Sequence, residues 1–102
     1  MHNFYTADQL SHIINQALLY QCACPAQVAK GIIDQRALYE YQQNCLNTTD
    51  TDMKVHQSIA DCAETCHKNL EACLKEILTI EGWDPETLDM PESLKKRFMD
   101  NA

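Results

Sequence analysis

Three cysteines in the second half of the chain stand at helical spacing. Cys62 and Cys66 are one helical turn apart, and Cys73 follows Cys62 by almost three turns, so at about 100° per residue the three thiols project from one side of a helix. Thiolates bind soft ions: two or three satisfy Cu(I), whereas a closed structural Zn(II) site usually has four ligands. The spacing therefore favours Cu(I) over Zn(II) or iron.

Two further thiols, Cys22 and Cys24, lie at the start of the preceding predicted helix. If the turn between the two helices is centred near Thr48, Cys73 comes level with Cys24 and close to Cys22. This matching of heights predicts a three-thiol cluster at one end of the helix pair. Cys45 lies near the opposite end, apart from the cluster.

The same matching places Cys66 and Cys62 level with Gly31 and Gln35, where the small Gly31 would leave room for a two-thiol site. His67 lies on the flank of the cysteine stripe. The predicted metal ligands are therefore Cys62, Cys66, Cys73, Cys22, Cys24 and His67.

Three other interpretations fit parts of the same pattern. A free cysteine also packs as a small apolar side chain, so core packing explains each thiol without a metal. A thiol at a helix N-terminus is more reactive, which makes Cys22 and Cys24 a candidate redox pair. Cys62-x-x-x-Cys66-His67 is a haem-attachment motif with one extra residue, but covalent attachment normally follows export, and no export signal is visible.

A di-iron carboxylate site is a further alternative, because Glu64-x-x-His67 matches the Glu-x-x-His motif of di-iron bundles. The direction of the carboxylate argues against it. Glu64 lies about 160° round the helix from Cys66, away from the apolar positions that would face a shared site.

The stretch 61–67, followed by 71–76, resembles cysteine-rich four-helix-bundle copper-binding proteins. In that family, Cys-x-x-x-Cys pairs line the inside of a helical bundle and hold Cu(I). The resemblance implies that Cys62 and Cys66 form such a pair, with Cys73 further along the lining. The family usually carries cysteines on every helix, whereas few stand on the first two helices here, so one or a few ions are implied rather than a bulk store.

These side chains must be positioned by long helices. The chain of 102 residues has only two glycines and three prolines, with 45% apolar residues, so turns are few and elements are long. We expect a single all-α domain over residues 1–102. Short connections predict an antiparallel bundle of three main helices plus a short C-terminal helix.

The first helix is predicted to begin with a capping box, Thr6 to Gln9, and to end near Gln21. Its apolar positions recur at helical spacing. They are Leu10, Ile13, Ile14, Ala17 and Leu18.

The second helix is predicted to start at Pro25, with Cys24 as its cap, and to end before the turn at 47–50. Its inward positions are expected at Val28, Ile32, Gln35, Tyr39 and Gln42.

The third helix is predicted over 51–81, ended by Gly82, and a last short helix over 91–99. In the third helix, steps of three and four predict the inward side of a packed helix. That predicted side holds Val55, Ile59, Cys62, Cys66, Leu70, Cys73, Ile77 and Ile80.

Charge and composition disfavour several classes of binding partner. The net charge of −7 disfavours nucleic acid and anionic membranes. No apolar run approaches the ~20 residues of a membrane span, and the first residues lack the features of a signal peptide. We therefore expect a cytoplasmic protein with reduced thiols. No catalytic triad or phosphate loop is present, so no conventional enzyme activity is predicted.

The third helix is about ten residues longer than the second, so about 15 Å of its far end is expected to overhang. That end carries Leu74, Ile77, Leu78 and Ile80. The first helix, the segment at Trp83 or a second subunit could cover this apolar surface, and a homodimer is expected. The alternative to metal binding is a metal-free dimeric interaction module that packs its cysteines and binds a protein partner near Trp83.

Overall fold

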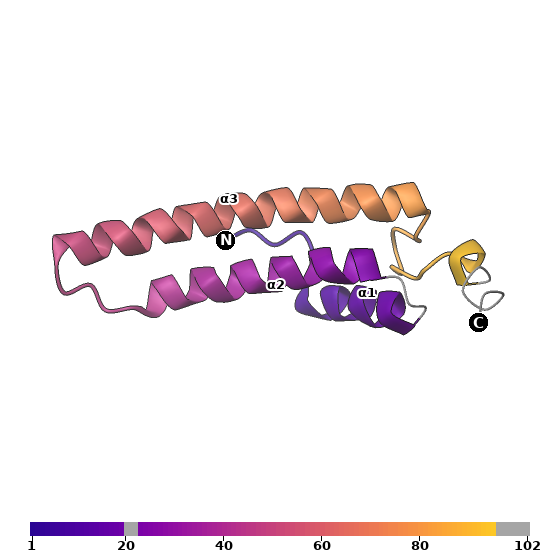
Figure 1. The fold of residues 1–102 in the computed structure, drawn as a ribbon, viewed down its shortest axis with the longest axis horizontal. Coiled ribbons are helices and arrows are strands. Elements are labelled where there is room, and N and C mark those ends of the chain that lie inside the picture. Colours follow the sequence, from indigo (N-terminus) through magenta and orange to yellow (C-terminus); the bar gives the residue numbers. More distant parts are fainter. Residues whose placement is uncertain (20–22, 96–102) are drawn as a thin grey trace.

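The computed structural model describes residues 1–19 and 23–95, and this part of the chain is all-helical. Helices α1 (Ala7–Leu19), α2 (Ala23–Asn44) and α3 (Asp50–Glu81) are followed by one helical turn at 92–95. As Figure 1 shows, α2 lies between α1 and α3, and α3 runs back along α2. The predicted three main helices and short final helix are confirmed over these residues.

The molecule is long and thin, with principal extents of 59 × 22 × 17 Å. Its radius of gyration is 16.9 Å, compared with about 13 Å for a compact domain of this length. None of the helices within residues 1–19 and 23–95 is long and apolar enough to cross a bilayer.

The helix ends follow local sequence signals. Thr6 and Gln9 form the predicted reciprocal capping box, with N–H to side-chain oxygen distances of 3.1 and 2.9 Å. The Thr49 hydroxyl accepts from the Asp52 N–H at the start of α3. Gly82 ends α3 in the left-handed conformation, φ 83°, as predicted.

Two boundaries differ from expectation or fall outside the described residues. Helix α2 begins at Ala23, so Cys24 lies within the first turn rather than at the cap. The predicted end of the first helix near Gln21, the thiol of Cys22, and the end of the last helix at Met99 lie outside the described residues.

The core is concentrated at one end of the molecule, where α1, the first half of α2 and the second half of α3 meet. Residues 83–90 fold against α1: the Met90 N–H donates to Gln16 at 3.1 Å, and His12 Nε2 lies 2.7 Å from Asp89 Oδ1. This segment closes the end of the core. The buried cluster comprises Tyr5, Leu10, Ile13, Ala17, Ala26, Ala29, Ile32, Leu74, Leu78, Trp83, Leu88 and Met90.

The register between α2 and α3 differs from the prediction by about one turn. Gly31 lies beside Leu70, since a Cβ added at Gly31 would stand 3.3 Å from a Leu70 methyl group. The reason is the linker at 45–49, which is extended along α3: Asn47 Oδ1 lies 2.6 Å from His56 Nδ1. The overhang therefore lies at the start of α3, and the core cluster covers Leu74 at its end.

The predicted inward side of α3 is wrong by about one residue of rotation. Cys62 and Cys73 are exposed, as are Val55 at 49% and Ile80 at 75%. The side that faces the rest of the chain is about 100° away. It buries Ala60, Ala63, His67, Glu71, Leu74 and Leu78. Two of these, His67 and Glu71, are polar, so the spacing of apolar residues alone does not identify them as buried.

Gly82 provides a clean test of the α3 terminus. A Cβ added there would meet nothing within 4 Å, so its cost arises from the positive φ alone. We expect Gly82→Ala to lower the free energy of unfolding by about 1–2 kcal/mol, measured by urea denaturation. Gly82→Asn is the control and should cost less, because Asn tolerates this conformation. Equal stability of the wild type and the Ala variant would contradict the assignment.

Candidate functional site

Cys62 and Cys66 form the closest pair of candidate ligands on α3. The two thiols hydrogen-bond to each other, and this bond, together with the charge of a neighbouring Cys62 thiolate and partial burial, raises the pKa of Cys66. Cys62 is exposed and Cys66 is half-buried. The sequence correctly placed the two thiols together, but they lie on the surface of this chain rather than inside it.

The other predicted ligands lie apart from this pair. Cys73 is exposed two turns further along α3, and Cys24 is exposed in the first turn of α2. With Gly31 beside Leu70, Cys24 is level with about Ile77, one turn beyond Cys73. Within residues 1–19 and 23–95, no three His, Cys, Asp or Glu side chains converge as a metal site. The described part of the predicted three-thiol cluster is therefore not assembled within one chain.

His67 belongs to a different site, on the inward side of α3. Its side chain is 1% exposed, its Nε2 accepts from Arg36 Nε at 2.9 Å, and its Nδ1 lies 3.4 Å from Glu71 Oε1. Both ring nitrogens thus have protein neighbours. Within the described residues, His67 does not converge with Cys62 and Cys66 into a group that could hold a metal ion.

Glu71 is the centre of this buried polar cluster. Its Oε2 accepts from the backbone N–H groups of Phe4 at 2.8 Å and Tyr5 at 3.0 Å, and from Arg36 Nη2 at 3.2 Å. Arg36 Nη2 also donates to the Tyr5 carbonyl at 2.6 Å. Burial and the Glu71 charge raise the pKa of Tyr5. The cluster fastens the segment before α1 to both α2 and α3.

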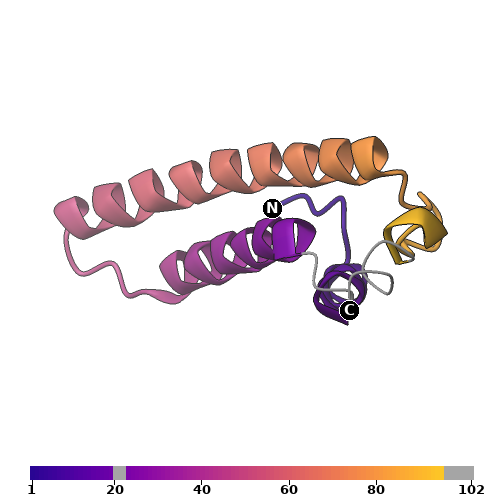
Figure 2. The ribbon, with the colours of Figure 1, turned by 45° about the vertical axis from the view of Figure 1, so that its right-hand side comes forward.

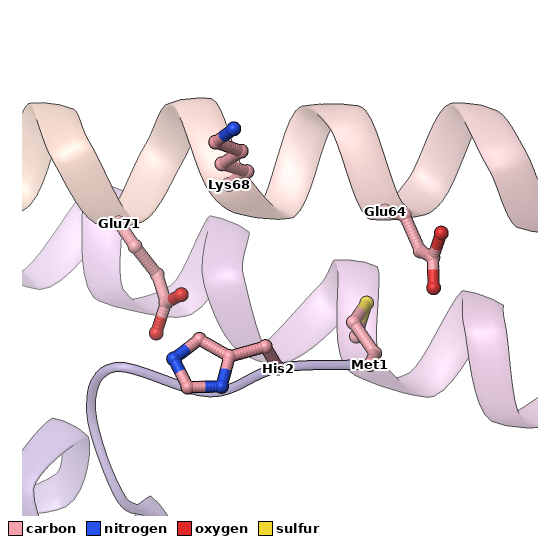
Figure 3. Close-up of a pocket in the computed structure, with 5 residues that line it drawn as sticks. All are labelled: Met1, His2, Glu64, Lys68 and Glu71. Atoms are coloured by element: carbon pink, nitrogen blue, oxygen red, sulfur yellow. The ribbon is translucent and has the colours of Figure 1, made fainter.

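The segment before α1 borders an open cavity of about 370 Å³, lined by Met1, His2, Glu64, Lys68 and Glu71. In Figure 3, Glu64 and Glu71 extend from α3 towards the segment that carries Met1 and His2. Glu64 therefore faces this segment and not the cysteines, as its predicted direction implied. Without a convergent set of ligands, the carboxylates offer no di-iron arrangement in the described chain.

Sequence reasoning missed the role of Arg36 and Glu71. The available signal was the four-residue spacing of His67 and Glu71, which places both side chains on one side of a helix. An arginine on a neighbouring helix is the expected partner for a buried carboxylate. Only the packing of α2 on α3 shows which arginine it is.

Comparison of the chain with models of protein families, with curated protein sequences and with solved structures found no match.

The Glu71 cluster should control how firmly the first residues are held. We expect Glu71→Gln to lower the free energy of unfolding by about 3 kcal/mol, because it removes the charge that balances Arg36. Hydrogen exchange at the Phe4 and Tyr5 amides should accelerate. Glu64→Gln is the matched control and should change stability by less than about 0.5 kcal/mol. Similar small effects of both variants would contradict the central role of Glu71.

The burial of His67 predicts a pH dependence of stability. Burial lowers the pKa of His67, against the opposing effect of Glu71. The unfolded chain then takes up a proton that the folded chain does not, so stability falls as the pH falls below about 6.5, by at most about 1.4 kcal/mol per pH unit.

Urea denaturation between about pH 7.5 and pH 5 measures this loss. His67→Gln, whose amide oxygen offers Arg36 an acceptor, should show a shallower dependence than the wild type. The other histidines are present in both proteins, so the difference isolates His67. If the stability of the wild type and of His67→Gln fell equally with pH, the lowered pKa of His67 in the folded chain would be contradicted.

Proposed function

We propose that this protein binds a soft metal ion, Cu(I), through the Cys62–Cys66 pair. The observation that carries the proposal is that Cys62 and Cys66 stand one turn apart on one side of α3, with Cys62 exposed and Cys66 half-buried. Two thiolates satisfy Cu(I) without a third ligand. The pair is open to an incoming ion, and the helix holds both sulfurs on adjacent turns.

The chemistry of the pair suits replacement of protons by a cation. The hydrogen bond to Cys62 keeps the Cys66 thiol protonated and raises its pKa. A bound cation would remove the repulsion between two thiolates while releasing their protons. Affinity for the ion should therefore increase with pH.

Other ions fit this pair less well. Zn(II) in a closed site usually takes four ligands, and an iron carboxylate site needs inward carboxylates. The Cys62–Cys66 pair supplies two sulfurs, and Glu64 faces the segment at Met1 and His2 instead. Both observations favour Cu(I).

A metal-free interaction module is the second candidate. The exposed apolar side chains of Val55 and Ile80 on the cysteine side of α3 favour it. In that case the cysteines would serve as small apolar contacts in an interface. Metal titration separates the two functions.

The metal proposal is tested by titrating the fully reduced protein with Cu(I) against a competing chelator. We expect about one tightly bound Cu(I) per chain. Cys62→Ala and Cys66→Ala should each weaken binding by at least about 100-fold, since even the hydrogen-bond partners of metal ligands are worth about 10- to 100-fold.

Cys24→Ala is the control, because that thiol is exposed on another helix. It should leave the affinity within about threefold of the wild type, the usual range for a surface change away from a site. Weak Cu(I) binding that is unchanged by Cys62→Ala and Cys66→Ala would refute the proposal and favour the interaction module.

A further inference from the structure

One side of α3 carries apolar and thiol side chains that this chain leaves exposed or only half-buried. We call it the thiol face; it comprises Val55, Ile59, Cys62, Cys66, Cys73 and Ile80. The segment before α1 contacts α3 on another side, at Glu71, which is about 160° round the helix from Cys73. Figure 2 shows residues 1–6 lying between α3 and α1, while α3 extends well beyond them.

Most charged residues of α3 lie away from the thiol face. At about 100° per residue, six of the ten charged side chains of α3 fall within about 80° of one another on the opposite flank, whereas Asp52 and Glu76 border the thiol face. A side with exposed apolar groups and few charges is typical of the centre of a protein interface. The six are Asp50, Lys54, Asp61, Glu64, Lys68 and Lys75.

Four residues of the thiol face are placed symmetrically about the point between His67 and Lys68. Cys62 precedes that point by as many residues as Cys73 follows it, and Val55 and Ile80 are also equidistant from it. A second α3, laid antiparallel across a twofold axis at this point, would therefore set Cys62 against Cys73 and Val55 against Ile80, with Cys66 level with Asn69 and Ile59 level with Glu76. Such self-complementarity is what a twofold interface between identical chains requires.

A related pattern occurs along α2. Cys24, Gly31 and Leu38 recur every seven residues, which keeps them on one side of the helix, and Cys45 follows seven residues after Leu38, just beyond the helix end. Cys24 and Cys45 are equidistant from the point between Asp34 and Gln35, as are Gly31 and Leu38. All four are exposed or half-buried in the single chain, Leu38 with 39% of its surface exposed.

The two centres lie at one height in the molecule. Gly31 stands beside Leu70, and Arg36 Nε bonds to His67 Nε2 at 2.9 Å. On α2 the two contacts lie on either side of the point between Asp34 and Gln35. On α3 they lie close to the point between His67 and Lys68. A single twofold axis perpendicular to the helices therefore relates both faces at once, although the two sequence patterns are independent.

We propose that a second copy of this chain packs antiparallel on the thiol face, forming a four-helix bundle from two α2–α3 pairs. Cys62 then faces Cys73 of the partner subunit, and Val55 faces the partner's Ile80. Cys24 lies level with the partner's Cys45.

The size of the surface suits a stable dimer. From Val55 to Ile80 the thiol face is about 38 Å long, and two adjacent helices are about 20 Å wide. This gives about 750 Å² per copy, close to the about 800 Å² per partner of a standard interface. Two chains of net charge −7 also meet here on the side of α3 with the fewest charges.

The dimer would complete the proposed metal site. The partner's Cys73 arrives at the height of the Cys62–Cys66 pair, which offers Cu(I) a third thiolate from the second chain. This consequence rests on the proposed function, whereas the dimer itself does not. The dimer is therefore tested on reduced, metal-free protein with a chelator present. A monomeric result would overturn the dimer without bearing on Cu(I) binding.

The first experiment tests the face and the direction of packing by sedimentation equilibrium. Val55→Lys and Ile80→Glu should each raise the dimer dissociation constant by at least about 100-fold, because each buries an unpaired charge. The double variant should dimerise again, since each lysine would face the partner's glutamate. Leu19→Lys, at an exposed apolar residue of α1, is the control and should remain dimeric.

Three results would overturn the proposal. They are a wild type that is monomeric at all concentrations, single variants that dimerise normally, and a double variant that is more monomeric than either single variant. The last result would indicate parallel packing, which would place like charges together. Circular dichroism checks that each variant keeps its helices, and Val55 and Ile80 are exposed in the single chain, so folding should not depend on them.

The second experiment identifies the paired thiols. Two variants are made in which all cysteines except Cys62, or all except Cys73, are changed to serine. Diamide takes two electrons and two protons from two thiols as the disulfide forms. Antiparallel packing predicts crosslinked dimers only when the two variants are mixed. If either variant alone crosslinked as efficiently as the mixture, the proposed register would be wrong.

Discussion

The buried contact between Glu71 and Arg36 sets the rotation of α3 about its own axis. Glu71 faces inward because Arg36 and the Phe4 and Tyr5 amides supply its hydrogen bonds. A carboxylate without these partners would be too costly to bury. No buried side-chain nitrogen or oxygen in the described residues lacks a hydrogen-bond partner. Once Glu71 is turned inward, the cysteine side of the same helix must face outward.

This rotation changes the chemistry available to the thiols. Cysteines packed inside one chain would be inert and surrounded by aliphatic groups. On the outside of α3, Cys62 and Cys66 are adjacent and accessible, while Cys73 is too far along the helix to join them. One chain therefore supplies a two-thiol site, and a third thiolate must come from elsewhere. The symmetry of the α2 and α3 patterns provides a reason to look for it in a second copy.

The elongated shape of the molecule follows from the position of its core. The core is concentrated where α1 and residues 83–90 cover α2 and α3, and the rest of the α2–α3 pair consists of two helices with little else against them. Two isolated helices bury too little apolar surface to be well stabilised alone. A second pair of helices would give this half of the molecule a core of its own.

The sequence by itself determined the three helices, the start of the first and the end of the third, because the capping box at Thr6, the left-handed Gly82 and the spacing of apolar residues are local properties. It also placed Cys62 and Cys66 together, since neighbours on adjacent turns follow from helix geometry alone. It did not determine which side of α3 faces α2. That side includes His67 and Glu71, whose burial depends on Arg36, thirty-one and thirty-five residues away in the chain. Such a long-range polar contact leaves no periodic signal, so only the tertiary structure decided that the cysteines lie on the surface.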